Sequence, residues 1–181
     1  MKHLLSALLA FALLAPMSSG EAQTEAAAAT PAPTLQGHWV PAASIRSIES
    51  RRDAAVERVT DEMSIFARGI AGRRLRAGMP VPRQIIISGT GPSFRAKVGD
   101  YDLNFPADGS RHAMTDPFGE DINSSQGYRN GRLRQVMRAD GGTLTHVLQL
   151  SEDGNTLTLT IRIGSPRLPA DVVYRVRYRR R

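Results

Sequence analysis

Apolar and polar residues alternate with a period of two along most of the chain after residue 84. Alternation of this kind is typical of strands that bury one face. The short runs between the alternating segments carry turn residues, above all Asn130-Gly131 and Asp140-Gly141, which favour tight hairpins. The predicted strands cover residues 84–88, 93–98, 101–105, 110–116, 120–129, 132–138, 142–150, 155–163 and 171–179. Hairpins that follow one another without a helix predict an antiparallel meander, closed or nearly closed into a small barrel.

A different period marks the segment from about residue 44 to 77, which follows a short extended stretch at 35–41. Apolar residues here recur mostly at steps of three, four or seven, as on one stripe of an amphipathic helix. The stripe consists of Ile45, Ile48, Ala55, Val59, Met63, Phe66 and Ile70. Ser50 with Asp53 is a candidate N-terminal cap, Gly69 and Gly72 predict a break, and Gly78 with the prolines after it ends the segment. The fold class is therefore mainly β (α+β), with an N-terminal amphipathic helical segment.

The first 22 residues have the pattern of a secretory signal peptide. Lys2 precedes an apolar run from Leu4 to Ala15, and small residues allow cleavage after Ala22. The run is too short for a membrane-spanning helix, which needs about 20 apolar residues. Residues 23–34 contain almost only Ala, Thr and Pro and read as a disordered linker, which leaves 35–181 as a single domain.

The chain contains no cysteine. It therefore has no residue to carry the lipid of a bacterial lipoprotein, no disulfide and no thiol nucleophile. The expected location is periplasmic or secreted.

Basic residues outnumber acidic ones, with 24 Lys and Arg against 17 Asp and Glu and a net charge of +7. The basic residues are almost all arginines and are scattered, except for a cluster at 73–76 and the tail at 177–181. No basic stretch is interleaved with aromatic residues, so nucleic acid is not an expected partner. A solvated surface is one interpretation of the two clusters, and contact with an anionic envelope surface is the other.

Gly37-His38-Trp39 at the start of the domain, followed by a meander that ends in an arginine-bearing strand, resembles the calycins, which include lipocalins and fatty-acid-binding proteins. The helical segment after the first strand is similar to the fatty-acid-binding branch. The resemblance implies that an arginine of the last strand, Arg175 or Arg177, covers Trp39. That branch holds a ligand carboxylate with an Arg-x-Tyr on the last strand, but here Val176 precedes Tyr178 in the arginine's position. The chain is also similar to uncharacterised exported bacterial proteins.

Polar residues on the predicted inner faces are the candidate ligand contacts. His146 shares a face with Leu144, Leu148 and Leu150, so its imidazole is expected to point inward. Matching parity on the neighbouring strands adds five more residues. The candidate ligand-binding set is His112, Ser124, Gln126, Tyr128, Gln135 and His146. An apolar cavity with a few polar groups suits a small molecule; the alternative is that His146 is a core histidine satisfied by protein groups.

No arrangement of residues points to catalysis, a metal or a cofactor. Ser88-Gly89-Thr90-Gly91 lacks the order of a nucleophile elbow, and the three histidines after residue 22 have no metal-ligand spacing. Two non-enzymatic functions remain. The first is a periplasmic protein that binds a small apolar or amphipathic molecule in the barrel. The second is an envelope structural or interaction protein with a packed barrel, acting through its helix and basic surface. Neither implies a membrane span, and the oligomeric state stays open.

Overall fold

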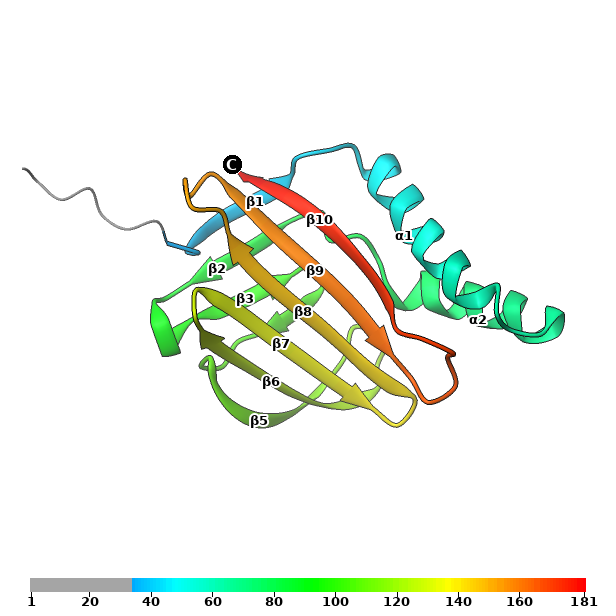
Figure 1. The fold of residues 1–181 in the computed structure, drawn as a ribbon. Coiled ribbons are helices and arrows are strands. Elements are labelled where there is room, and N and C mark those ends of the chain that lie inside the picture. The colour runs from blue at the N-terminus through cyan, green and yellow to red at the C-terminus, as the bar shows by residue number, and fades with distance from the viewer. Residues whose placement is uncertain (1–33) are drawn as a thin grey trace, which may run out of the picture. The chain divides into compact units, whose positions relative to one another are not determined.

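The computed structural model describes residues 34–181, so the predicted signal peptide and nearly all of the linker lie outside the described residues. Ten strands form one antiparallel sheet that curls into a nearly closed barrel, and two helices follow the first strand (Figure 1). The elements are β1 Gly37–Pro41, α1 Ile45–Thr60, α2 Ile65–Gly78, β2 Ile85–Ser88, η1 Gly91–Ser93, β3 Arg95–Val98, β4 Tyr101–Leu103, β5 Asp108–Thr115, β6 Asp121–Arg129, β7 Arg132–Ala139, β8 Gly142–Leu150, β9 Thr156–Gly164 and β10 Val172–Arg180. The predicted fold class is confirmed.

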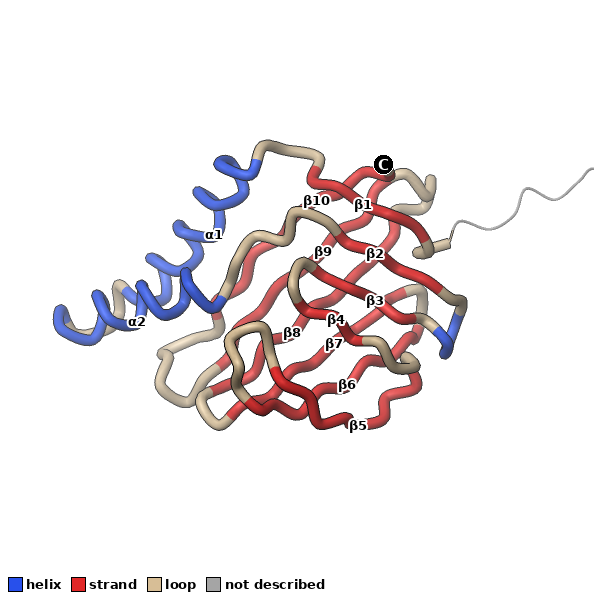
Figure 2. Tube along the Cα trace, turned by 180° about the vertical axis from the view of Figure 1, so that it is seen from behind, coloured by secondary structure: helices blue, strands red, loops and turns tan. Residues whose placement is uncertain are grey.

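The sheet order runs β4-β3-β2-β1-β10-β9-β8-β7-β6-β5. Only one pairing is not sequential: β1 pairs with β10 through Trp39 and Arg180, which joins the two ends of the meander. β4 and β5 are the two edges, and the barrel remains open between them. Figure 2 shows these edges facing each other from the side opposite to Figure 1.

The hairpin between β6 and β7 forms as its turn residues predict. Asn130 and Gly131 have φ of 51° and 71°, the conformation that a type I′ turn requires. The two-residue turn Asp140-Gly141 also joins the expected strands, but neither residue has positive φ. Asp140-Gly141 therefore forms the predicted tight hairpin without the conformation of a type I′ turn.

The helical segment differs from its prediction at three points. The side chain of Ser44, not Ser50, caps α1, because its Oγ accepts a hydrogen bond from the Ser47 amide. The break falls between Thr60 and Ile65, whereas Gly69 and Gly72 lie inside α2. Because α2 turns back at this break, the apolar stripe does not continue: Ile48, Ala55 and Val59 of α1 are buried, but Phe66 and Ile70 of α2 are 89% and 51% exposed.

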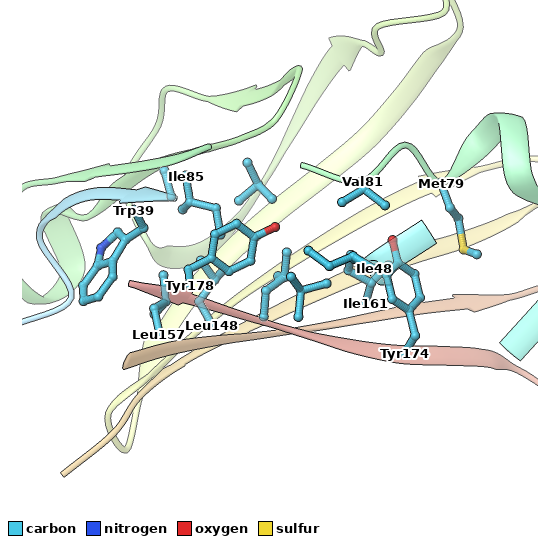
Figure 3. Packing of buried hydrophobic residues seen from close by; sticks show 14 of the residues in the cluster. Trp39, Ile48, Met79, Val81, Ile85, Leu148, Leu157, Ile161, Tyr174 and Tyr178 are labelled. Atoms are coloured by element: carbon cyan, nitrogen blue, oxygen red, sulfur yellow. The ribbon is translucent and has the colours of Figure 1, made fainter. Parts of the chain in front are cut away.

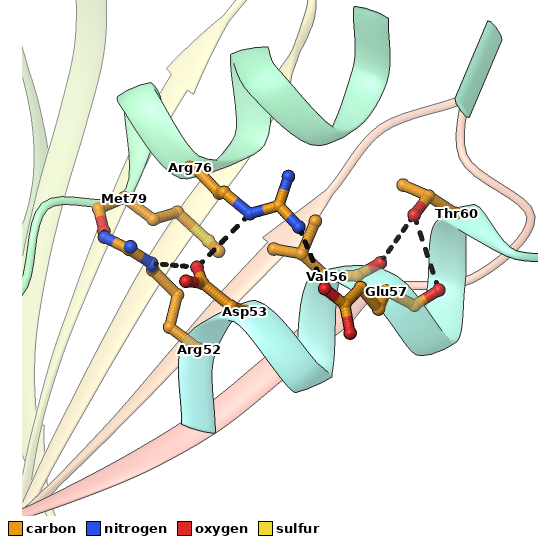
Figure 4. A network of polar contacts seen from close by, with 7 residues as sticks. All are labelled: Arg52, Asp53, Val56, Glu57, Thr60, Arg76 and Met79. Carbon is orange, nitrogen blue, oxygen red and sulfur yellow. Dashed lines mark hydrogen bonds and ion pairs between the residues drawn. The ribbon is translucent and has the colours of Figure 1, made fainter. Parts of the chain in front are cut away.

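α1 packs on the barrel through its buried residues, and α2 is joined to α1 by ion pairs (Figure 4). The guanidinium of Arg76 lies 3.3 Å from a carboxylate oxygen of Asp53 and 3.3 Å from one of Glu57. Arg52 pairs with Asp53 at 3.0 Å and donates to the Met79 carbonyl at the end of α2. These contacts fix α2 at one end of the barrel. Neither helix of residues 34–181 is both long and apolar enough to cross a membrane.

Candidate functional site: a cavity between the second helix and the barrel end

The barrel interior is filled at the end that contains Trp39. Trp39, Tyr178 and the surrounding aliphatic side chains are completely or almost completely buried in one hydrophobic cluster (Figure 3). The aliphatic residues of this part include Ile85, Leu148 and Leu157, all 0% exposed. Close packing of this kind leaves no space for a ligand.

The Gly37-His38-Trp39 motif has a clear physical role at this end. The Arg180 guanidinium lies 4.4 Å from the centroid of the indole ring, and the indole N–H of Trp39 donates to the Leu35 carbonyl. Gly37 has φ of 143°, and a Cβ there would lie 2.5 Å from Arg180 Nη1. A glycine is therefore needed for the arginine to reach the indole. The arginine that covers Trp39 is Arg180.

The expectation that Arg175 or Arg177 covers Trp39 is wrong. Both arginines are exposed, because they alternate with the buried Tyr174, Val176 and Tyr178 along β10. Arg180 follows the exposed Arg179 and so breaks this alternation at the end of the strand. Its side chain also donates to the carbonyls of Thr34 and Gln36, at 2.6 Å each.

The six candidate ligand contacts do lie on one face, as the strand register shows. His112 is paired with Ser124, Gln126 with Gln135, and Gln135 with His146. Of the six, Ser124, Gln126, Gln135 and His146 are buried. His112 is half-buried and stacks on Phe105, and Tyr128 is 36% exposed with its ring edge against Phe94.

Three of the buried residues form a chain of hydrogen bonds across the interior. His146 Nδ1 lies 3.3 Å from Gln135 Oε1, and Gln135 Nε2 donates to Gln126 Oε1 and to the Ala96 carbonyl. The Gln126 amide also lies within hydrogen-bonding distance of the carbonyls of Phe94, Leu103 and Phe105. The Gln126 side chain thus spans the opening between the two sheet edges from the inside. Protein groups satisfy the hydrogen-bonding capacity of the side chains of Gln126 and Gln135.

Burial holds His146 in its neutral form, because it lowers the pKa of the imidazole from 6.5 to about 4. Next to it, the ring of Tyr101 lies edge-on to the imidazole, with centroids 5.9 Å apart. Burial, with smaller contributions from Asp116 and Asp100, raises the pKa of Tyr101 to about 12.

Space remains at the opposite end of the barrel from Trp39, next to α2. A cavity of about 710 Å³ lies between α2, the β5–β6 and β7–β8 turns and the β9–β10 loop. A ligand site in proteins typically measures about 300–1,000 Å³. The walls are largely apolar, with Arg74, Asp116 and Arg167 as the charged groups. The apolar wall residues include Met63, Ile70, Ala71, Leu75, Ile122, Met137, Leu144, Ile163 and Leu168.

A smaller pocket of about 350 Å³ lies further inside and contains the polar groups. Gly78, Tyr101 and Leu144 line both spaces, so the two are neighbours separated by these residues. Met79, His146 and Tyr174 belong to the inner pocket alone. We refer to the two spaces as the outer cavity and the inner pocket.

Tyr174 is the site residue that the sequence does not single out as polar. Its alternation in β10 places it inward, but only the structure shows that its hydroxyl is buried without a hydrogen-bond partner. Among the described residues, the only other buried side-chain polar atom in this condition is Ser124 Oγ. Tyr178, four residues further along β10, differs because its hydroxyl donates to the Pro82 carbonyl at 2.9 Å. No group of side chains within residues 34–181 is arranged to hold a metal ion.

A meander of ten strands with a helix pair after the first strand, and an internal space next to that pair, defines a barrel of the calycin type. No family model and no curated protein sequence matches the chain. Among solved structures, Echinococcus granulosus fatty-acid-binding protein 1 is similar with a TM-score of 0.50 at 15% identity, covering 81% of this chain and 96% of that one. The REP1-NXSQ fatty acid transporter has a TM-score of 0.50 at 14% identity, with coverage of 81% and 96%. The chain therefore has the fold of the fatty-acid-binding proteins.

The resemblance stops short of that family's ligand contact. Val176, in the position of the arginine of Arg-x-Tyr, is completely buried in the hydrophobic cluster. The hydroxyl of Tyr178 already donates a hydrogen bond to the Pro82 carbonyl. Neither Val176 nor Tyr178 is therefore available to bind a carboxylate.

Proposed function

We propose that this chain is a non-enzymatic carrier or sensor that binds a small apolar or amphipathic molecule next to α2. The observation that carries the proposal is the outer cavity, about 710 Å³ in volume with mainly aliphatic walls. Burying apolar ligand surface there stabilises a complex by about 25 cal/mol per Å² before the entropic costs of binding. The fold supports the proposal, because similar barrels include a fatty-acid-binding protein and a fatty acid transporter.

The two hypotheses from the sequence apply to different parts of one barrel. The part around Trp39 is packed with side chains, as the structural alternative expects. The part next to α2 contains the outer cavity and the inner pocket, as the carrier hypothesis expects. A ligand would therefore occupy the end under α2, and would not reach the residues packed around Trp39.

Blocking the outer cavity should weaken binding. Ala71 of α2 lines the cavity, so Ala71→Trp would place an indole inside it. We expect the affinity for Nile red, an uncharged dye that fluoresces in apolar surroundings, to fall by at least about tenfold, since 1.4 kcal/mol of lost contact has this effect. Fluorescence titration measures the change.

Ala77→Trp is the matched control, since Ala77 is exposed on the same helix and does not line the cavity. This variant should bind the dye like the wild type. Equal affinity of the wild type and Ala71→Trp would place the binding site elsewhere. Absence of dye binding by the wild type would contradict the proposal itself.

We also propose that the protein works outside the cytoplasm, in the periplasm or as a secreted protein. The support is the signal-peptide pattern of Lys2 and Leu4–Ala15 with small residues before Gln23. In a Gram-negative host, the protein released by osmotic shock should have the intact mass of a chain that begins close to Gln23. An uncleaved chain in the membrane fraction would contradict export.

An anionic membrane surface is a second candidate partner, and the exposed residues of α2 favour it. Ile65 and Phe66 are 84% and 89% exposed, and the same helix carries the exposed arginines Arg73 and Arg74. Apolar residues beside arginines suit the interface of an anionic bilayer. The protein should co-sediment with phosphatidylglycerol vesicles and not with phosphatidylcholine vesicles, and the double variant I65S/F66S should remain in the supernatant. Equal sedimentation of this variant would remove α2 as the contact.

A further inference from the structure

The inner pocket differs from the outer cavity in its chemistry. The outer cavity is mainly aliphatic, whereas polar groups meet in the inner pocket. The Tyr174 hydroxyl is buried there without a partner, and the side chain is 5% exposed. Figure 3 shows this hydroxyl directed from β10 towards the segment of Met79 and Val81, which forms the opposite wall of the pocket.

A buried hydroxyl without a partner costs free energy of folding, so its presence in a pocket needs an explanation. The neighbouring imidazole of His146 lines the same pocket, is bonded through Nδ1 to Gln135, and packs against the Tyr101 ring. A hydrogen-bond donor at Tyr174 can serve a ligand group that accepts a hydrogen bond.

The charges around the inner pocket exclude an ionised group at its buried end. The imidazole of His146 is neutral, because burial lowers its pKa to about 4. Arg83 and Asp100 line the pocket only on its exposed side and have opposite charges. Arg52 is close enough to influence the pKa of Tyr174, but it does not line the pocket and is committed to Asp53 and the Met79 carbonyl. A carboxylate or ammonium in this position would be buried without a counter-charge, which is strongly unfavourable.

We propose that the inner pocket binds the uncharged polar end of the ligand, a hydroxyl, carbonyl or amide, with the Tyr174 hydroxyl as its hydrogen-bond donor. This inference rests on the proposed function, in which the apolar part of the same ligand fills the outer cavity. It distinguishes the chain from proteins that hold a carboxylate, because the specificity here comes from an unpaired tyrosine in place of an arginine.

The test compares three molecules with the same alkyl chain and different ends: dodecan-1-ol, dodecanoate and dodecylammonium. Each competes with Nile red for the full-length mature protein at pH 7.4. We expect dodecan-1-ol to bind at least about tenfold more tightly than either ion. In Tyr174→Phe, its affinity should fall about three- to tenfold, as expected for the loss of one neutral hydrogen bond, and the affinities for the two ions should not change.

Tyr178→Phe provides the matched control on the same strand. This variant leaves the Pro82 carbonyl without its hydrogen bond, so the urea concentration at the midpoint of unfolding should fall. Tyr174→Phe removes a hydroxyl that has no partner, so its midpoint should stay the same or rise. Tighter binding of dodecanoate or dodecylammonium, or unchanged alcohol affinity in Tyr174→Phe, would overturn the inference and leave the proposed function standing. A lower midpoint for Tyr174→Phe would also overturn it, because the hydroxyl would then have a structural partner. If neither the dye nor any of the three molecules binds, the proposed function itself fails.

Discussion

Replacing Trp39 with alanine should lower the free energy of unfolding by about 3–5 kcal/mol, the range for large aromatic residues in packed cores. Trp39 is 0% exposed and lies where β1 joins β10 and β2, so its removal opens a cavity where these three strands meet. A domain of this size has a total stability of about 5–15 kcal/mol. The variant should therefore lose a large share of its stability.

A urea titration followed by far-ultraviolet circular dichroism measures this loss, since the variant has no tryptophan to report on unfolding. The native wild type should show blue-shifted, poorly quenched emission from its single tryptophan. Arg180→Ala is the control for the cation–π contact and should cost only about 0.5–1 kcal/mol, because the arginine is exposed. A loss below about 2 kcal/mol for Trp39→Ala, or red-shifted native emission, would contradict this account.

Acidification should destabilise the protein through His146. Burial lowers the pKa of its imidazole from 6.5 to about 4, so the unfolded chain binds a proton more readily than the folded one between these values. Neutral His146 makes its full contribution to the free energy of unfolding above about pH 6.5, and this contribution is lost as the pH falls towards 4. A shift of this size corresponds to about 3 kcal/mol of stability over the interval.

Urea titrations at several pH values from 7.5 to 4.5 should show this decline in the wild type. His146→Gln removes the titrating group and keeps an amide next to Gln135, so its stability should decline less over the same interval. Hydrogen bonds from Ser110 and Ser151 lower the pKa of Asp108 and Asp153, and these contributions are lost only at still lower pH. The same pH dependence in the wild type and in His146→Gln would show that another group is responsible.

The strands were predictable because each has one buried face. Along β9, Leu157, Leu159 and Ile161 are buried and alternate with threonines and arginine, and the structure places the strand within one residue of the predicted range. The period of two and the turn residues are local properties, so they are visible in the chain without its partners. The same pattern predicted the inner faces on which Gln126, Gln135 and His146 meet.

The helical segment was less predictable because its apolar stripe belongs to two helices with different surroundings. Ile48 and Val59 are buried against the barrel, whereas Phe66 and Ile70 continue the period but are exposed. The position of the break depends on where α2 meets α1, through Arg76 with Asp53 and Glu57. These ion pairs join residues about 20 positions apart, so periodicity does not reveal them.

By itself, the sequence determined the mainly β class, nearly all strand bounds, the inward positions of His146 and Tyr174, and the absence of any thiol. The tertiary structure alone decided which arginine covers Trp39, because Arg180 reaches the indole only where β1 pairs with β10. It also decided that Gln126 and Gln135 are satisfied by protein groups, whereas the Tyr174 hydroxyl is not. Hydrogen-bond satisfaction depends on atoms brought together from distant strands, and residue type and parity contain no information about it.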